Sequence, residues 1–334
     1  MIRRKTLFLL TAAAVAAAMT GCGNKNAAET SAAATTAAAQ TEASSEPETK
    51  APEEAGDQAD LVVAGGDGAG MIAAIQAVKE GLDPSKVVIV EKTGELGSDL
   101  DSMENFMNAS NTDEQYDGDI EDSYELYLGD ITKSGNNKND VNLAGFVAES
   151  SEESLTWLRD MGIEMDGVTK ENGSSVARSY TAANGDLSKL LKAKLLEQVE
   201  TLKIKVETDS AVDEVLFNED GSVSGIKVSG TEGQKTIGCA AILITEPDLL
   251  TLLKDTSSVF TTDEAGGITG LLVDNCAEVV SQDGEFLPGL YAAGRVIAPA
   301  VSGEAALPGN NMTAMILFGI TAGSESEIYV SDLR

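Results

Sequence analysis

The sequence predicts an α/β fold, a parallel sheet covered by helices, with an inserted antiparallel β-meander. Three observations predict it. The stretch LVVAGGDGAGMIAAIQAVKEG, residues 61–81, has the order of a buried strand, a glycine turn and a helix. A second apolar strand, KVVIV at residues 86–90, completes a β-α-β unit. From residue 204 onward, the hydrophobic pattern changes from helical spacing to the alternation of strands.

The remaining elements follow in order along the chain. Apolar residues at helical spacing predict helices near residues 119–133, 141–161 and 185–202, and Trp157 on the second of these is expected in the core. Four strand candidates come next: IKVET, AVDEVLFN, VSGIKVSG and KTIGCAAILIT. The segments EDGS and GTEGQ supply turns between them. A last strand, GLYAAG, and a helix from about residue 310 to 323 close a domain predicted to span residues 59–323, with residues 324–334 as a tail.

The first 58 residues are predicted to lie outside this fold. Arg3, Arg4 and Lys5 precede a short apolar run, a pattern typical of an export signal rather than of a membrane span. The motif MTGC, which ends at Cys22, resembles a bacterial lipobox, in which the cysteine is lipidated; an ordinary secretory signal is the alternative. Residues 1–21 are therefore predicted to be a lipoprotein signal peptide, and residues 22–58 a disordered Ala/Thr/Glu-rich tether. The expected location is extracytoplasmic, with the chain lipid-anchored to the bacterial cell membrane.

Composition excludes several classes of function. Asp and Glu total 55 against 23 Lys and Arg, and a formal charge of −32 repels nucleic acid, which is therefore not an expected partner. The chain has no histidine, which excludes a Ser-His-Asp triad and any His-ligated metal site, and no metal is predicted. With Cys22 assigned to the lipid, Cys239 and Cys276 are either two buried thiols or a disulfide.

The glycine turn has the chemistry of a dinucleotide-binding loop. In such a loop the first glycine permits the turn, the second lets a diphosphate approach, and the third packs helix against strand. Gly65, Asp67 and Gly70 hold these positions, so an aspartate replaces the second glycine. Glu91 ends the next strand, where an acid commonly binds ribose hydroxyls. The pattern predicts a Rossmann-like fold, but Asp67 would set a carboxylate against the diphosphate unless the flanking glycines serve in a shifted register.

Several stretches in the same order resemble the FAD-dependent flavoproteins of the fumarate reductase, succinate dehydrogenase and flavocytochrome c group. Beside the loop, these stretches are VVIVEKTGELGSD, MNAS, ESSEESLTWLRDMGIEMD, GSSVARSY, GLYAAG and PGNNMTAMILFGITAG. The resemblance covers about residues 60–323 and implies a Rossmann-like FAD-binding domain with FAD as cofactor. By position in the family, it implies FAD contacts from Gly65, Gly70, Glu91, Gly97, Val212, Gly294 and Asn310, with the backbone of Val212 facing the adenine.

The sequence departs from the family pattern where family members contact cofactor or substrate. The family's Gly-Gly-Asn reads Gly97-Ser98-Asp99, and the glutamate after YAAG becomes Arg295. The segment between ITEP and DEAGG is too short for the family's capping domain, so residues 246–265 are predicted to be its remnant. Arg178 and Arg295 are the candidate cations for an anionic substrate; the alternative is that both are surface charges.

These observations leave two functions open. The first is a membrane-anchored extracytoplasmic FAD-dependent oxidoreductase of fumarate-reductase-like ancestry. It would pass electrons between flavin and a redox partner protein or small-molecule acceptor; no catalytic residue is assigned, and fumarate reduction itself is not expected. The alternative is a degenerate flavoprotein-fold lipoprotein that binds FAD weakly or not at all and acts as a binding or interaction module. A solute-binding lipoprotein fits the signal and tether but not the glycine loop.

Overall fold

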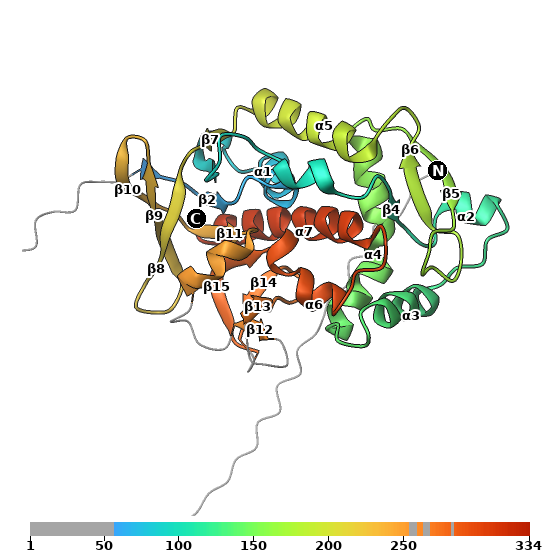
Figure 1. Ribbon diagram of the computed structural model, residues 1–334. Helices are drawn as coiled ribbons and strands as arrows, with labels where there is room; N and C mark the ends of the chain where they lie inside the picture. Colours follow the sequence, from blue (N-terminus) through green and yellow to red (C-terminus); the bar gives the residue numbers. More distant parts are fainter. Residues whose placement is uncertain (1–56, 254–258, 263–267, 282–283) are drawn as a thin grey trace, which may run out of the picture. The chain divides into compact units, whose positions relative to one another are not determined.

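A six-stranded sheet forms the centre of the folded unit. The computed structural model describes residues 57–253, 259–262, 268–281 and 284–334. The sheet has the order β14-β15-β11-β2-β3-β7 (Figure 1). Its strands are β2 (Leu61–Ala64), β3 (Val87–Val90), β7 (Lys205–Glu207), β11 (Ala241–Ile244), β14 (Glu278–Val280) and β15 (Phe286–Ala292). All neighbours pair in parallel except β14, which is antiparallel at one edge, and the predicted α/β fold is confirmed.

Two helices, α1 (Gly68–Glu80) and α7 (Asn310–Asp332), cover one face of this sheet. They pack against each other and against the strands (Figure 1). Every residue of β2 and β3 is buried, as the continuous apolar runs predict for central parallel strands. The helices approach closely because α7 presents glycine to α1: a Cβ on Gly323 would lie 2.8 Å from the Cβ of Gln76.

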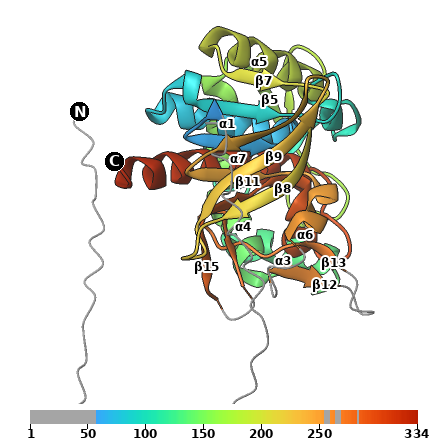
Figure 2. The ribbon, with the colours of Figure 1, turned by 90° about the vertical axis from the view of Figure 1, so that its left-hand side faces the viewer.

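A four-stranded sheet, in the order β1-β10-β9-β8, lies against the other face through β9 (Figure 2). Its strands are β1 (Asp57–Gln58), β8 (Ala211–Phe217), β9 (Val223–Gly230) and β10 (Gly233–Gly238). Two sequence expectations are wrong here. KTIGCAAILIT forms two strands, β10 and β11, which belong to different sheets, and IKVET supplies β7 of the central sheet rather than a meander strand.

The other elements extend the α/β unit. The helices are α2 (Asp113–Asp117), α3 (Tyr124–Ser134), α4 (Val141–Asp160), α5 (Leu187–Leu202) and α6 (Ala298–Ser302). Short strands are β4 (Met107–Asn108), β5 (Met165–Thr169), β6 (Ser179–Ala182), β12 (Phe260–Thr262) and β13 (Ile268–Leu271). The 3-10 turns are η1 (Pro84–Lys86), η2 (Ser98–Ser102), η3 (Pro247–Leu253) and η4 (Gly294–Val296). The helix predicted from residue 119 begins at Tyr124, because Ser123 caps it and Asp119 has a φ of 53°.

The structure shifts several predicted boundaries. Residues 57 and 58 pair in parallel with β10, so the folded part begins inside the predicted tether of residues 22–58. Helix α7 continues to Asp332, so most of the predicted tail is helical. The predicted signal peptide, Cys22 and part of the predicted capping remnant lie outside the described residues. None of the helices that the structure describes combines the length and apolar character that a membrane crossing needs.

Trp157 is buried in the core, as predicted. Cys239 and Cys276 are both free thiols rather than a disulfide, and only Cys239 is buried, whereas Cys276 is half-buried.

Candidate functional site

Four adjacent parallel strands end at one edge of the central sheet, and the segments that follow them form the candidate site. β2 leads into the glycine turn and β3 into Glu91, while β11 leads into Thr245 and Glu246. β15 leads into Gly294 and Arg295. Ligands of open α/β sheets bind outside the carboxyl ends of the strands, so this edge is where the fold predicts a binding site.

The backbone donors of the glycine turn point to carboxylates of this chain. The three pairs are Gly66 N with Glu91 Oε2 at 2.7 Å, Gly68 N with Asp99 Oδ1 at 3.0 Å, and Gly70 N with Asp67 Oδ1 at 2.9 Å. The acceptors come from β3, η2 and the turn itself. Amides at the start of a helix form an anion-binding site, and here each holds an anionic or acidic oxygen of the protein. The amides of Gly66, Gly68 and Gly70 therefore form an anion-binding site, which we call the cradle.

Glycine is required at two positions of the turn. Gly65 has a φ of 117°, and a Cβ there would lie 2.9 Å from Cγ of Glu246. A Cβ on Gly70 would overlap the carbonyl oxygen of Gly65, because the first turn of α1 crosses directly over the end of β2. These are the roles that the sequence pattern predicts for the first and third glycines.

Asp67, which replaces the second glycine, is the N-cap of α1 and is only 3% exposed. Its Oδ1 accepts the hydrogen bond from Gly70 N, whereas Oδ2 is buried and has no hydrogen-bond partner among the described residues. Burial and then the charge of Asp99 raise the pKa of Asp67 to about 8. The Gly70 amide lowers the pKa of Asp67, and the nearby Thr245 hydroxyl lowers it to a smaller extent. Thr245 makes no regular hydrogen bond to Oδ2. This environment therefore favours the protonated form of Asp67 at neutral pH.

The surroundings of the cradle are predominantly acidic. Burial raises the pKa of Asp99, while the Gly68 amide and Arg295 act against it. Arg295 pairs with Glu246 at 2.5 Å, and Lys92 lies 3.7 Å from the same carboxylate. Within the described ranges, no group of three or more Cys, Asp and Glu side chains is arranged to hold a metal ion.

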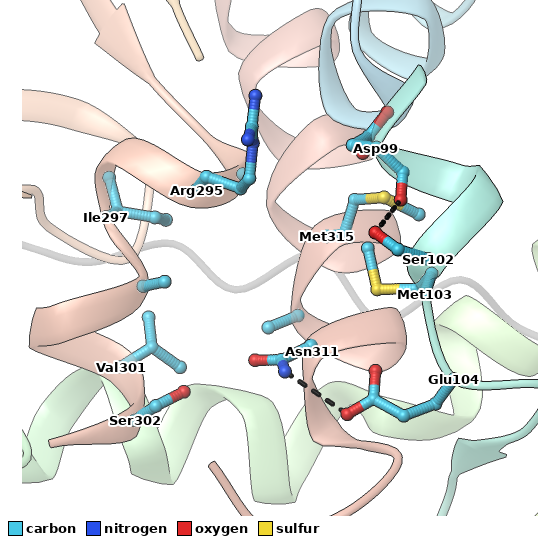
Figure 3. A pocket seen from close by; sticks show the side chains of 13 residues that line it. Asp99, Ser102, Met103, Glu104, Arg295, Ile297, Val301, Ser302, Asn311 and Met315 are labelled. Carbon is cyan, nitrogen blue, oxygen red and sulfur yellow. Dashed lines mark hydrogen bonds between the residues drawn. The ribbon is translucent and has the colours of Figure 1, made fainter. Parts of the chain in front are cut away.

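A cavity of about 350 Å³ lies beside the cradle (Figure 3). One wall is formed by η2 and the residues after it: Asp99, Ser102, Met103 and Glu104. The opposite wall is formed by η4 and α6, with Arg295, Ile297, Val301 and Ser302, and α7 supplies the floor with Asn311, Ala314 and Met315. Asn311 donates a hydrogen bond to Glu104 at 3.2 Å. A mainly apolar slot of this size with a few polar groups suits a small organic ring system.

A second hollow, of only about 20 Å³, lies on the other side of Gly65. Val212 and Glu91 line it. Lys92 and Asp248, which form an ion pair, lie at its rim. The place where the family resemblance implies adenine is therefore almost filled by the protein's own side chains.

The structure brings most of the implied cofactor residues together. Gly65, Gly70 and Glu91 meet at the cradle, Gly97 N donates to Gly66 O at 2.7 Å, and Gly294 lines the cavity beside the cradle. Asn310 differs: its side chain is buried and accepts a hydrogen bond from the Tyr127 hydroxyl at 2.6 Å.

The next residue, Asn311, is the one that lines the cavity. Asn311 is not among the residues predicted from the sequence, although Asn311 and Met315 stand four positions apart, which places them on one helical face.

Arg178 lies elsewhere and is not available to a ligand. It is fully buried and bonds Asp122 through Nε at 3.1 Å and Nη2 at 2.8 Å, with Nη1 3.1 Å from Asp130. Its guanidinium also stacks 4.3 Å from the ring centre of Tyr127. Arg178, one of the two cations that the sequence suggested for an anionic substrate, therefore has a structural role.

Comparisons with known proteins agree with this geometry. The FAD binding domain family matches residues 60–247 and 256–312, more than half of the chain. NADH:fumarate oxidoreductase of Klebsiella pneumoniae is 35% identical over 188 residues, which are 54% of this chain and 20% of that protein. A fumarate reductase (cytochrome) of Shewanella frigidimarina is 33% identical over 175 residues, 52% of this chain and 30% of that protein. The chain thus spans less than a third of either relative.

A solved structure of a flavocytochrome c3 fumarate reductase in an open conformation shares the fold, with a TM-score of 0.70 at 16% identity over 82% of this chain and 79% of that one. FAD is the cofactor of the matched family, in agreement with the sequence resemblance. The chain therefore belongs to the FAD binding domain family, as a flavoprotein related to the fumarate reductases.

Proposed function

We propose that the protein is a membrane-anchored, extracytoplasmic FAD-dependent oxidoreductase that acts on a neutral or cationic small molecule. One observation carries the proposal: three backbone donors of the glycine turn each bind an acidic oxygen beside a cavity of about 350 Å³, in a chain of this family. Bound FAD would supply hydride and electron transfer.

The described residues fit FAD at the diphosphate and at the ring. The oxygens of Glu91 and Asp99 on Gly66 N and Gly68 N have the hydrogen-bonding chemistry of phosphate oxygens. A diphosphate would take the place of the Asp99 carboxylate at Gly68, and the cavity between η2 and α7 would hold the ring. At the adenine end, the closing pair of Lys92 and Asp248 consists of side chains that are 45% and 52% exposed, which leaves them free to move.

The protein's own groups define what enters the cavity. Asp99 and Glu104 place two acidic groups on its wall. Arg295, the cation of the opposite wall, is already paired with Glu246. A dicarboxylate requires convergent cations, and this lining opposes one. We therefore expect neutral or cationic acceptors to bind better than fumarate.

The proposed location rests on the sequence. The basic residues Arg3, Arg4 and Lys5, the short apolar run and the MTGC motif support export followed by lipidation of Cys22. In a bacterial host, the full chain should fractionate with membranes and incorporate labelled palmitate, whereas Cys22→Ser should remove the label. Recovery of unlabelled full chain from the cytoplasm would contradict this location.

Retention of flavin by the purified chain is the direct test of cofactor binding. The chain is incubated with FAD, freed of excess, and examined for a flavin absorbance band that dithionite bleaches. A retained, reducible band supports the oxidoreductase. Its absence would favour the second candidate, a binding or interaction module, for which the nearly filled adenine end and the occupied loop amides are the supporting observations.

A further inference from the structure

We infer that Asp67 is a cofactor-binding residue that carries a proton and donates a hydrogen bond from Oδ2 to the diphosphate, so that FAD binds to the protonated form of the site. The inference deepens the FAD binding proposed above and rests on it. It assigns a role to the residue that departs from the family's glycine pattern at the centre of the cradle.

The geometry separates the two oxygens of Asp67. Oδ1 is fixed by the hydrogen bond from Gly70 N at 2.9 Å, which is the usual contact of a helix N-cap. Oδ2 is buried and unpaired among the described residues, and it lies 3.4 Å from where a Cβ on Gly294 would stand. Gly294 lines the cavity beside the cradle, so Oδ2 lies next to a residue of that wall, although Asp67 itself does not line the cavity. A buried polar atom without a partner is costly, and a phosphate oxygen would supply the missing acceptor.

The surroundings determine which protonation state holds. Asp67 faces Asp99 from η2 and Glu246 from the end of β11, with the neutral Thr245 hydroxyl beside it. The cation that faces both Asp67 and Asp99 is Arg295, which is paired with Glu246. An ionised Asp67 would add a charge to this acidic group and repel a diphosphate, whereas the protonated acid attracts it as a neutral donor. Burial also favours the protonated acid, because it raises the pKa of Asp67.

The role of the glycine is therefore replaced rather than lost. A glycine at this position lets the diphosphate contact backbone amides directly. Here the side chain caps α1 through one oxygen and offers a donor through the other. The difference between the two arrangements is pH dependence, because a side-chain acid loses its donor when it ionises and a backbone amide does not.

The first test measures the FAD dissociation constant from flavin fluorescence between pH 5.5 and 9.5, for the wild-type chain, Asp67→Asn and Asp67→Gly. Asn keeps the N-cap acceptor and places a permanent N–H donor at the position that Oδ2 has in Asp67. Gly restores the family residue. The wild-type dissociation constant should be flat below pH 7 and should rise about tenfold per pH unit above pH 8, because one proton is taken up with FAD. Both variants should show no such rise.

The two hypotheses fail in different ways. FAD binding by the wild type that is as independent of pH as binding by Asp67→Asn would overturn the proton-bearing role and leave the proposed function standing. An absence of FAD binding by all three chains at every pH would overturn the proposed function and this inference with it.

The second test needs no cofactor. Asp67 binds its proton in the folded chain at pH values where the unfolded chain has lost it, so its contribution to stability is complete at low pH and is lost as pH rises toward 8. The unfolding equilibrium constant of the wild type, divided by that of Asp67→Asn, should rise up to about tenfold per pH unit between pH 5 and 8 and then level off. A ratio that stays constant across this range would show that Asp67 is ionised and would overturn the inference.

Discussion

At the carboxyl edge of the sheet, single side chains of the protein make the hydrogen bonds that a bound anion would make. Glu91 and Asp99 occupy the amides of Gly66 and Gly68, and Asp67 occupies that of Gly70. The cradle is therefore satisfied without a ligand, and a diphosphate must displace the Asp99 carboxylate from the Gly68 amide in order to bind. This competition, rather than the shape of the turn, is what should set the affinity for FAD.

Replacing Gly70 with Ala should destabilise the fold, because its Cβ would overlap the Gly65 carbonyl oxygen, which is backbone and cannot rotate away. We expect a loss of roughly 1–3 kcal/mol in the free energy of unfolding, measured by urea denaturation. Gly129→Ala is the matched control: this exposed helical glycine has nothing within 4 Å of a Cβ, and Ala there should stabilise by roughly 0.5–1 kcal/mol. Equal effects at the two positions would contradict the close crossing of helix and strand.

Arg178→Met should cost roughly 3–5 kcal/mol in urea denaturation, because it leaves Asp122 and Asp130 without their buried cation. Arg159→Met removes a surface pair with Glu114, whose side chain is 40% exposed, and should change the same free energy by less than about 1 kcal/mol. A small loss for Arg178→Met would mean that the buried cluster is not part of what holds α3 against the core.

Contacts between residues close together in the sequence could be predicted from it, whereas contacts between distant residues could not. The turn glycines and Glu91 were predictable, because their roles follow from spacing within one β-α-β unit. The bond from Gly68 N to Asp99 joins residues 31 positions apart and leaves no periodic signal. Asn310 and Asn311 are adjacent in sequence, and only the rotation of α7 decides that the first faces Tyr127 and the second faces the cavity.

At the scale of elements, the contact between α1 and α7 is built on small residues. Gly319 and Gly323 face α1, and a Cβ on Gly319 would lie 2.9 Å from Cγ2 of Ile72. The apolar period that predicted α7 did not predict its length, because its later turns are half polar and still pack on their buried side through Ser326 and Val330. Likewise, the apolar run KTIGCAAILIT could not show that the chain leaves one sheet and enters another within it.

Gly323→Val should separate α1 from α7, because the added side chain would meet backbone atoms of Ala73. Thermal or urea unfolding should show a loss of roughly 1–3 kcal/mol. Ile328→Val places the same side chain on the same helix at a position that is 50% exposed, and should change stability by less than about 0.5 kcal/mol. If both substitutions were tolerated equally, the helices would not depend on the glycine contact.

At the scale of the whole molecule, the formal charge of −32 opposes the approach of any anion to the cradle. Raising the salt concentration from 10 to 100 mM shortens the screening length from about 30 to about 10 Å. The association rate of FAD, followed by stopped-flow fluorescence, should therefore rise several-fold over this range. Riboflavin, which lacks the diphosphate, should associate at a rate that salt leaves unchanged; an equal response of the two ligands would assign the effect to something other than charge.

The position of α7 in the sequence has a consequence for the order in which the chain can fold. α1 is made near residue 70, but the helix that covers it is made only after residue 310. A nascent chain therefore carries an unfinished apolar surface on β2, β3 and α1 through most of its synthesis. Contacts between such distant segments form slowly. The core becomes complete only after α7 has left the ribosome, so a ribosome-bound chain that stops before residue 310 should be digested readily by proteases, whereas the released full chain resists them.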